Sequence, residues 1–476
     1  MALRPTLEVP PLRLVPPLTP GFAPLARVKV GFDAAVARAG GPRLILGFQR
    51  GEEVCRLETR IFQSGYVLSG WNWVFFRDLV RSGLAFYGAD KVWIGTDDQS
   101  VGQELVGLGH FLYPDNDPEA KVAFSAGFFR LVYGQPLEFR CALPFEVPEA
   151  NERWYPITGE TKGRVLCMDY GKSNVRAGGF VDVQLVGGLI DVGWEEAKQS
   201  DPTYLLNKSL EAARTAQAFL PEGQKFGRMR VSTAGIVANN RILIGTILRG
   251  VPRPQFDEAS RLFQETAEAM GIGDLVVVND GTAAAASLGF VNCLGAAFGS
   301  DEATGYFGEK GVTSQLVEGA FVPIECTDLS SPDGLFLYDW ARAWGLGGED
   351  FSQKGPAGHY ARLAGLVLEG EKLPERLMHL QSLHEAGEEK AAQICLTFAY
   401  RLASAIAWYK VFYPDMEHIV FMGRVMKGSF GQGALAACQE AFRMDYPEMA
   451  EQVSLHLAEE PEFEQLRTMA GIQAAA

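Results

Sequence analysis

From about residue 163 onward, the sequence passes twice through the same order of predicted elements. The first pass begins with three short apolar runs joined by tight turns within residues 165–194, and helical and strand patterns then alternate up to residue 280. Near residue 292 the order starts again and continues through the rest of the chain. Alternating strands and helices are typical of α/β proteins, and the repeated order indicates an internal duplication.

This duplication suggests how the 476 residues divide into domains. We predict an α/β fold in which two tandem ribonuclease-H-like domains, 161–292 and 293–476, enclose a cleft. The last helix of the second domain is expected to pack back on the first. Before them we predict an extended Pro-rich arm at 1–24 and an α+β extension at 25–160, where strand patterns alternate with a helical pattern.

Charge and cysteine content exclude several classes of protein. Lys and Arg number 43 and Asp and Glu number 58, so the net charge is −15, which disfavours general binding to nucleic acid. The seven cysteines are scattered without a CxxC pair, which is typical of a reduced protein without a structural zinc site. We find no apolar core of a signal peptide and no membrane-spanning stretch, and therefore expect a cytoplasmic protein.

The strongest single motif is VVVNDGTAAAASLGF at 276–290. An apolar strand ends at Asn279-Asp280, and a helix of small residues follows at once. Ligands of open α/β folds bind at the carboxyl edge of the sheet, where this pattern places Asp280. Asp280 could instead simply cap the helix. A cap alone explains neither the Asn-Asp pair nor four consecutive alanines, so we favour a functional role.

Three further motifs indicate phosphate or nucleotide binding. DYGKSN at 169–174 and GSDEATGY at 299–306 place Gly, hydroxyl and acidic residues in turns between apolar strands. Such turns let backbone amides approach an anion, and an Asp can hold hydrated Mg²⁺. MGRVMKGSFGQG at 422–433 is a Gly-rich turn between a strand and a helix. Each motif is weak alone, since ordinary turns have similar compositions.

Together and in this order, the four motifs resemble those of the repressor–ORF–kinase (ROK) sugar kinases, within the hexokinase and actin-like ATPase superfamily. The resemblance covers residues 163–476 and includes STAGIVANN at 232–240, LRGVP at 248–252 and VEGAF at 317–321. Residues 40–150 resemble the amino-terminal extension found in one branch. The resemblance implies ATP-dependent phosphorylation of a sugar hydroxyl, with ATP and Mg²⁺ as cofactors.

The resemblance also implies roles for individual residues. Asp280 would take the proton of the sugar hydroxyl, as the general base. The residues implied to bind the sugar are Asn279, Glu318, Ser232, Thr233 and Gly235. The residues implied to bind the nucleotide and its phosphates are Asp169, Gly171, Lys172, Ser173, Gly299, Ser300, Asp301, Gly305, Gly423 and Arg424, with Asp169 also a candidate Mg²⁺ ligand.

This sequence departs from the family pattern at three glycines. Lys172, Asp301 and Arg424 stand where the family usually has Gly. In one interpretation Lys172 is an added phosphate ligand and Asp301 an added metal ligand. In the other, the two side chains pair with each other across the cleft and occupy the phosphate site. The family's zinc site is not expected, because His359 has no cysteine nearby.

Two functional hypotheses follow. The first is a cytoplasmic carbohydrate kinase that acts on a small sugar, with no role for nucleic acid or membranes. The alternative is a non-catalytic sugar-binding or regulatory protein with a degenerate nucleotide site. Aromatic segments at 75–80 and 126–133 in the extension suit a homo-oligomer interface, although such residues more often pack in a core.

Overall fold

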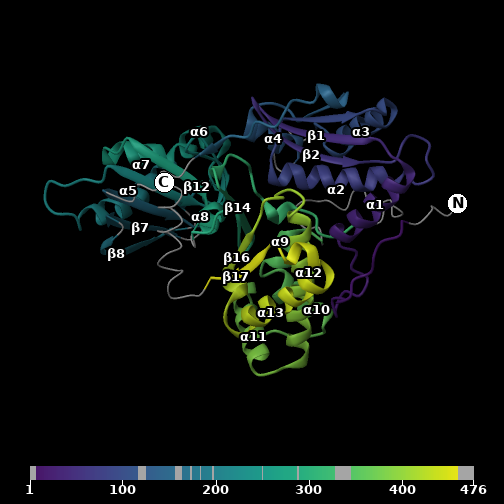
Figure 1. The fold of residues 1–476 in the computed structure, drawn as a ribbon. Coiled ribbons are helices and arrows are strands. Elements are labelled where there is room, and N and C mark those ends of the chain that lie inside the picture. The colour runs from purple at the N-terminus through teal and green to yellow at the C-terminus, as the bar shows by residue number, and fades with distance from the viewer. Residues whose placement is uncertain are drawn as a thin grey trace.

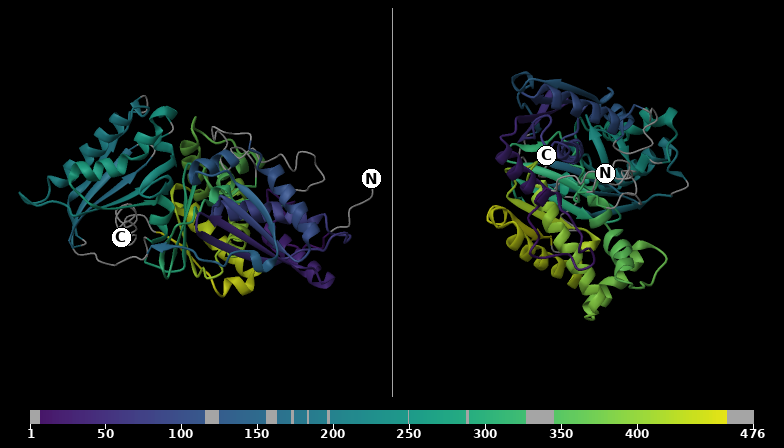
Figure 2. Two further views of the ribbon diagram at one scale, coloured as in Figure 1. Left: turned by 90° about the horizontal axis from the view of Figure 1, so that it is seen from above. Right: turned by 90° about the vertical axis from the view of Figure 1, so that its right-hand side faces the viewer.

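A computed structural model of the chain shows three large sheets that carry the fold (Figure 1). The amino-terminal sheet lies next to the helices of the carboxyl-terminal half, and the middle of the chain forms a third body to one side (Figures 1 and 2). Helices and strands are mixed throughout, which confirms the predicted α/β class. The structure describes residues 7–115, 125–155, 163–171, 174–182, 184–195, 198–248, 250–286, 289–326 and 345–458.

The amino-terminal region contains a sheet of four strands in the order β2-β1-β3-β4. β1 and β2 form a hairpin, β3 pairs antiparallel with β1, and β4 runs parallel to β3. The strands are β1 (Arg43–Arg50), β2 (Glu53–Arg60), β3 (Lys91–Thr96) and β4 (Glu138–Ala142). The helices are α1 (Leu25–Ala39), α2 (Trp71–Phe86), α3 (Gln99–Leu112) and α4 (Ala126–Tyr133).

The middle of the chain builds a five-stranded sheet in the order β12-β9-β6-β7-β8. β6, β7 and β8 form an antiparallel meander, while β9 and β12 run parallel to β6. This is the ribonuclease-H-like arrangement expected from the sequence. Its elements are β6 (Arg164–Tyr170), β7 (Asn174–Val181), β8 (Gln184–Gly193), α5 (Pro202–Gln217), β9 (Arg228–Thr233), β10 (Gly235–Ala238), β11 (Arg241–Gly245), α6 (Phe256–Ser260), α7 (Leu262–Met270), β12 (Asp274–Asn279) and α8 (Asp280–Ala286).

The carboxyl-terminal half repeats this topology in the sheet β17-β16-β13-β14-β15-β5. β13, β14 and β15 form the meander, β16 and β17 run parallel to β13, and β5 extends the sheet beyond β15. The elements are β5 (Trp154–Tyr155), β13 (Cys293–Phe298), β14 (Glu302–Gly308), β15 (Gly311–Thr313), α9 (Gly347–Phe351), α10 (Ala361–Leu363), α11 (Leu373–Glu385), α12 (Glu389–Tyr409), β16 (His418–Met422), α13 (Gly428–Asp445), α14 (Pro447–Ala450) and β17 (Ser454–Leu457).

The two sheets share one strand order, so the predicted duplication is confirmed. In a connection of the first of these sheets, the helical stretch from Phe256 to Met270 is divided at Arg261 into α6 and α7. The expected last helix, which was predicted to pack back on the first domain, lies outside the described residues. In the described part of the chain, no helix combines the length and the apolar character that a membrane span requires.

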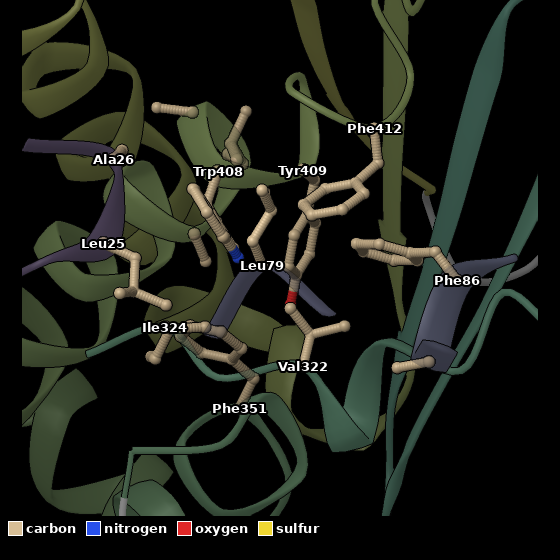
Figure 3. Packing of buried hydrophobic residues seen from close by; sticks show 14 of the residues in the cluster. Leu25, Ala26, Leu79, Phe86, Val322, Ile324, Phe351, Trp408, Tyr409 and Phe412 are labelled. Atoms are coloured by element: carbon tan, nitrogen blue, oxygen red, sulfur yellow. The ribbon is translucent and has the colours of Figure 1, made fainter. Parts of the chain in front are cut away.

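One hydrophobic core joins the amino-terminal region to the carboxyl-terminal half. Figure 3 shows Phe86 of α2 beside Tyr409 and Phe412, whose ring centroids lie 5.1 and 5.3 Å from that of Phe86. Aromatic pairs at this spacing add to the free energy of apolar burial. The amino-terminal region therefore packs directly on the carboxyl-terminal half, and the boundaries predicted near 160 and 292 remain predictions.

The aromatic segments that suit a homo-oligomer interface by sequence are part of this core. Phe75, Phe76, Phe128 and Phe129 are each at most 3% exposed. Their side chains pack within one chain, which leaves them no free surface to offer a second copy. The predicted homo-oligomer remains a prediction without support from these rings.

The Pro-rich arm lies along the carboxyl-terminal helices, with turns between residues 16 and 22. The backbone N–H groups of Arg13 and Leu14 donate to the carboxylate of Asp445 in α13, at 2.7 and 3.3 Å. Arg27 forms an ion pair with the same carboxylate at 2.9 Å. Because Asp445 is almost fully buried, these contacts tether the described part of the arm, 7–24, to α13.

Candidate functional site

Parallel strands bring three of the predicted motifs to one sheet edge. β6, β9 and β12 lie side by side, with Asp169 in register with Ser232, and Asn279 in register with Thr233. All these residues end their strands at the carboxyl edge, as the sequence predicted. The side chain of Asp169 is half-buried, whereas those of Ser232 and Thr233 are buried.

The first phosphate hairpin follows β6. The N–H of Gly171 donates to the carbonyl of Asn174 at 2.9 Å, and its own carbonyl accepts from the indole N–H of Trp194 at 3.0 Å. Both the N–H and the carbonyl of Gly171 are therefore hydrogen-bonded at the point where the chain enters the turn. Lys172 and Ser173, which the sequence places at the tip, lie outside the described residues, so the proposed pairing of Lys172 with Asp301 is not tested.

Asn279 organises the junction between β12 and α8. Its amide nitrogen donates to the carbonyl of Gly235 at 2.7 Å, and its Oδ1 accepts from the N–H of Gly281 at 2.7 Å. Gly235 has a φ of 133°, and a Cβ there would overlap the carbonyl oxygen of Ile244. The predicted sugar loop is thus fixed to the strand end that carries Asp280.

Asp280 begins α8, which packs with almost no gap on the second sheet. A Cβ on Gly281 would overlap the carbonyl oxygen of Thr304, and a Cβ on Gly305 would overlap the backbone nitrogen of Thr282. These glycines and the alanines of α8 allow a helix to lie directly against β14. Gly305, predicted to bind phosphate, therefore has a packing role here. The half-buried Asp280 lies at the junction of the two sheets.

Glu318 lies close to Asp280, although the two are 38 positions apart in the sequence. Burial, together with the charges of Asp280 and Asp301, raises the pKa of Glu318 to about 8. Part of the Glu318 side chain stays exposed. The VEGAF segment therefore places a partly accessible carboxyl group near the predicted base, as the resemblance implied.

The second hairpin adjoins the Gly-rich turn after β16. The N–H of Gly299 donates to the carbonyl of Asp301 at 2.9 Å and closes the turn, with Ser300 exposed at its tip. Gly423 has a φ of 90°, and a Cβ there would lie 2.5 Å from the carbonyl oxygen of Phe298. The exposed Arg424 follows. Two motifs separated by about 120 residues therefore form one surface.

Lys354 is the cation beside Asp301, and sequence reasoning missed it. Its Nζ lies 3.7 Å from Oδ2 of Asp301 and 2.9 Å from Oε1 of Glu349. The side chain of Asp301 is 63% exposed, so this pair is reachable from solvent. Gly348 approaches closely as well, since a Cβ on it would lie 2.8 Å from Oδ1 of Asp301. Nothing in the sequence around residue 354 indicates this contact.

Glu302 is the second residue near the candidate site, after Lys354, that the sequence did not indicate. It is 4% exposed, its Oε1 accepts from the Tyr409 hydroxyl at 3.4 Å, and its Oε2 has no hydrogen-bond partner in the described part of the protein. Burial, followed by the charge of Asp301, raises its pKa to about 8. The alternation Glu302, Thr304, Tyr306 along β14 was the available signal, because alternate strand residues share one face.

The carboxylates present suit a hard cation at the nucleotide side. Asp169 and Asp301 each end or follow a strand and keep their oxygens at least partly accessible, and Mg²⁺ prefers such ligands. Among the described residues, no group of three or more His, Cys, Asp or Glu side chains is placed to hold a metal ion. His359 instead contacts Glu349 at 3.3 Å and Arg362 at 3.0 Å.

Comparison with known proteins agrees with this fold. No family model and no curated protein matches the sequence. The ROK hexokinase from Thermus thermophilus superposes with a TM-score of 0.50 at 17% identity, over 66% of this chain and 98% of that one. The chain therefore has the fold of the ROK sugar kinases, as predicted, and a third of it lies outside the match.

Other solved structures match with lower TM-scores. A ROK family glucokinase from Streptomyces griseus, in complex with glucose and AMPPNP, has a TM-score of 0.45 at 14% identity, over 65% of this chain and 98% of that one. A ROK family transcriptional regulator, described as a homologue of an E. coli protein, has a TM-score of 0.49 at 15% identity, over 66% and 78% of the two chains.

Proposed function

We propose that the protein is an ATP-dependent sugar kinase that transfers the γ-phosphate to a sugar hydroxyl, with Asp280 as the general base. The observation that carries this proposal is the position of Asp280. Asp280 starts α8 at the carboxyl edge of the first sheet, and α8 packs on the second sheet. The charge of Asp280 also contributes to the raised pKa of Glu318. Phosphoryl transfer requires a positioned hydroxyl and a base more than a covalent nucleophile.

On the sugar side, the chain's own residues would orient the acceptor hydroxyl. Glu318 would bind neighbouring sugar hydroxyls, and the loop from Ser232 to Gly235, held by Asn279, would line the pocket. Asp280 would accept the proton as the hydroxyl oxygen bonds to the γ-phosphorus and ADP departs. Asn279 would act mainly by holding Gly235 and the start of α8.

On the nucleotide side, the two hairpins and the Gly-rich turn would bind ATP. Asp169, Gly171, Lys172 and Ser173 would approach the phosphates from the first domain. Mg²⁺, when bound, would neutralise phosphate charge, with Asp169 or Asp301 as its protein ligand. The proposed phosphate and adenosine contacts from the second domain are Gly299, Ser300, Asp301, Gly423 and Arg424.

The alternative is a sugar-binding or regulatory protein without turnover. One observation favours it: Asp301 extends its carboxylate from the hairpin that would receive a phosphate, and Lys354 is already paired with it. A carboxylate repels phosphate unless a cation lies between them. In both cases we propose a small sugar as the partner and the cytoplasm as the location.

Isothermal titration and a coupled ADP assay with a panel of hexoses test the proposal. We expect sugar-dependent ADP release that falls about 10²- to 10⁴-fold in Asp280→Asn, the usual contribution of a general base, with sugar affinity retained. Asp201→Asn is a matched control. Asp201 also starts a helix, by accepting from the Thr203 N–H, and Asn caps equally well.

The outcomes separate the two functions. Sugar binding without ADP release at any nucleotide concentration would support the regulatory alternative. Equal turnover in Asp280→Asn and the native protein would show that Asp280 is not the base.

A further inference from the structure

The backbone next to Glu318 is hydrogen-bonded to the amino-terminal region. The N–H of Val317 donates to the carbonyl of Phe86 at 2.8 Å, and the N–H of Glu318 donates to the carbonyl of Ala85 at 3.0 Å. Both carbonyls belong to the last turn of α2, where helix carbonyls lack partners within the helix. A segment of the proposed sugar site therefore satisfies the end of a helix from the extension.

Val317 itself has an unusual backbone conformation. Its φ is 50°, in the left-handed region that β-branched residues rarely adopt, and its side chain is 1% exposed. Such a conformation persists only where the surroundings hold it. The direction in which the chain enters Glu318 depends on this residue, because the two share a peptide bond.

Thr304 of β14 holds the same segment from the opposite side. Its hydroxyl donates to the carbonyl of Val317 and accepts from the N–H of Gly319 at 2.6 Å. Thr304 is 2% exposed, so water cannot easily replace the hydroxyl. One hydroxyl thus pairs with backbone groups on both sides of Glu318.

The end of α2 is in turn fixed by the second domain. The Tyr87 hydroxyl donates to the carbonyl of Phe412 at 2.6 Å, and the Trp408 indole donates to the Ser82 hydroxyl at 2.9 Å. Phe86 packs against the rings of Tyr409 and Phe412 (Figure 3). The carbonyls that receive Val317 and Glu318 are therefore rigidly placed.

We propose that the amino-terminal region positions a residue of the proposed sugar site. The end of α2 and the Thr304 hydroxyl together hold Val317 in its left-handed conformation, and this conformation orients Glu318. Thr304 is a positioning residue in this scheme and touches no sugar. The proposal rests on the proposed function for its consequence, which is sugar affinity. The backbone restraint itself can be measured without any sugar.

Hydrogen exchange read by mass spectrometry tests the restraint in the full-length protein. We compare the native chain with Thr304→Val, which keeps the shape and removes the hydroxyl, and with Thr304→Ser, which keeps the hydroxyl. Thr313→Val is the matched control, since Thr313 is also buried in the same sheet and also bonds to a backbone N–H. We expect about tenfold faster exchange in peptides covering 316–319 for Thr304→Val alone.

Titration with a sugar that the native protein binds gives the second readout. If only a tenth of the Thr304→Val molecules present Glu318 correctly, the apparent Kd rises about tenfold, while Kd for ATP is unchanged. Thr304→Ser should restore the native affinity. Native exchange and native sugar affinity in Thr304→Val would overturn the proposal.

A variant of α2 tests the contribution of the extension. Phe86→Leu loosens the last turn of α2 against Tyr409, and Phe139→Leu is a control that removes a buried ring elsewhere in the same region, beside Tyr113. We expect faster exchange at 316–319 and weaker sugar binding only for Phe86→Leu, and equal effects of both would contradict a specific role of α2. If no sugar binds the native protein, the proposed function fails, and the exchange results still decide the positioning claim.

Discussion

Replacement of Glu302 by Gln should stabilise the protein at alkaline pH. The carboxyl group is 4% exposed, lies beside the charges of Asp301, Asp350 and Glu318, and has one oxygen without a hydrogen-bond partner in the described part of the chain. Its pKa is about 8 in the folded protein, against 4.5 for an ordinary Glu. Because Gln is neutral and of similar shape, the variant removes the ionisation and little else.

The size of the effect follows from proton linkage. Between pH 4.5 and 8 the folded state holds a proton on Glu302 that the unfolded chain has lost. The free energy of unfolding therefore falls as pH rises, by about 1.4 kcal/mol per pH unit at most. From pH 5 to pH 8 this single group lowers the stability by roughly 3 kcal/mol. Glu318 acts in the same direction, so the Glu302→Gln protein keeps part of the slope.

Urea unfolding at pH 5 and pH 8 measures this difference. We expect Glu302→Gln to be near the native stability at pH 5 and about 3 kcal/mol more stable at pH 8. Glu309→Gln is the control, because Glu309 is exposed at the other end of the same strand pair and should change neither value. An unchanged pH slope in Glu302→Gln, or a loss of stability at pH 8, would refute the argument.

Two further substitutions test the site. Asp301→Gly removes the carboxylate that faces the proposed phosphate and leaves Lys354 paired with Glu349 alone, so ATP affinity measured by titration calorimetry should rise about tenfold if the site binds nucleotide. Weaker binding would instead identify Asp301 as a metal ligand. Gly305→Ala places a methyl group against the backbone of Thr282 and should cost about 1–3 kcal/mol in urea unfolding. Gly107→Ala in α3, where a Cβ meets nothing within 4 Å, should not destabilise, and equal losses in both variants would refute close packing of α8.

The edge of the first sheet could be predicted because its signals are local. An apolar run that ends in Asp169, Ser232 or Asn279 marks the end of a strand, and parallel strands end at a common edge. The four alanines singled out in the sequence belong to α8, which the structure shows packed against Thr304 and Gly305. The duplicated strand order could be predicted from the spacing of apolar runs and turns alone.

Other parts of the candidate site could not be predicted because they join residues far apart in the chain. Lys354 lies 53 positions after Asp301 in the sequence, and no pattern around it differs from ordinary surface sequence. The sequence shows Glu302 only as an acidic residue at the start of an apolar strand. Its missing partner and raised pKa depend on the carboxylates that the fold gathers around it.

The sequence by itself therefore determined the α/β class, the two repeated sheets and the strand ends that carry Asp169 and Asp280, because apolar period and turn residues act over a few neighbouring positions. Only the tertiary structure decided that α2 packs on the carboxyl-terminal half and hydrogen-bonds to Val317 and Glu318. Those contacts depend on how large apolar surfaces fit together. The shapes of side chains and the buried hydrogen bonds between distant segments determine how these surfaces pack, and no local sequence pattern predicts that packing.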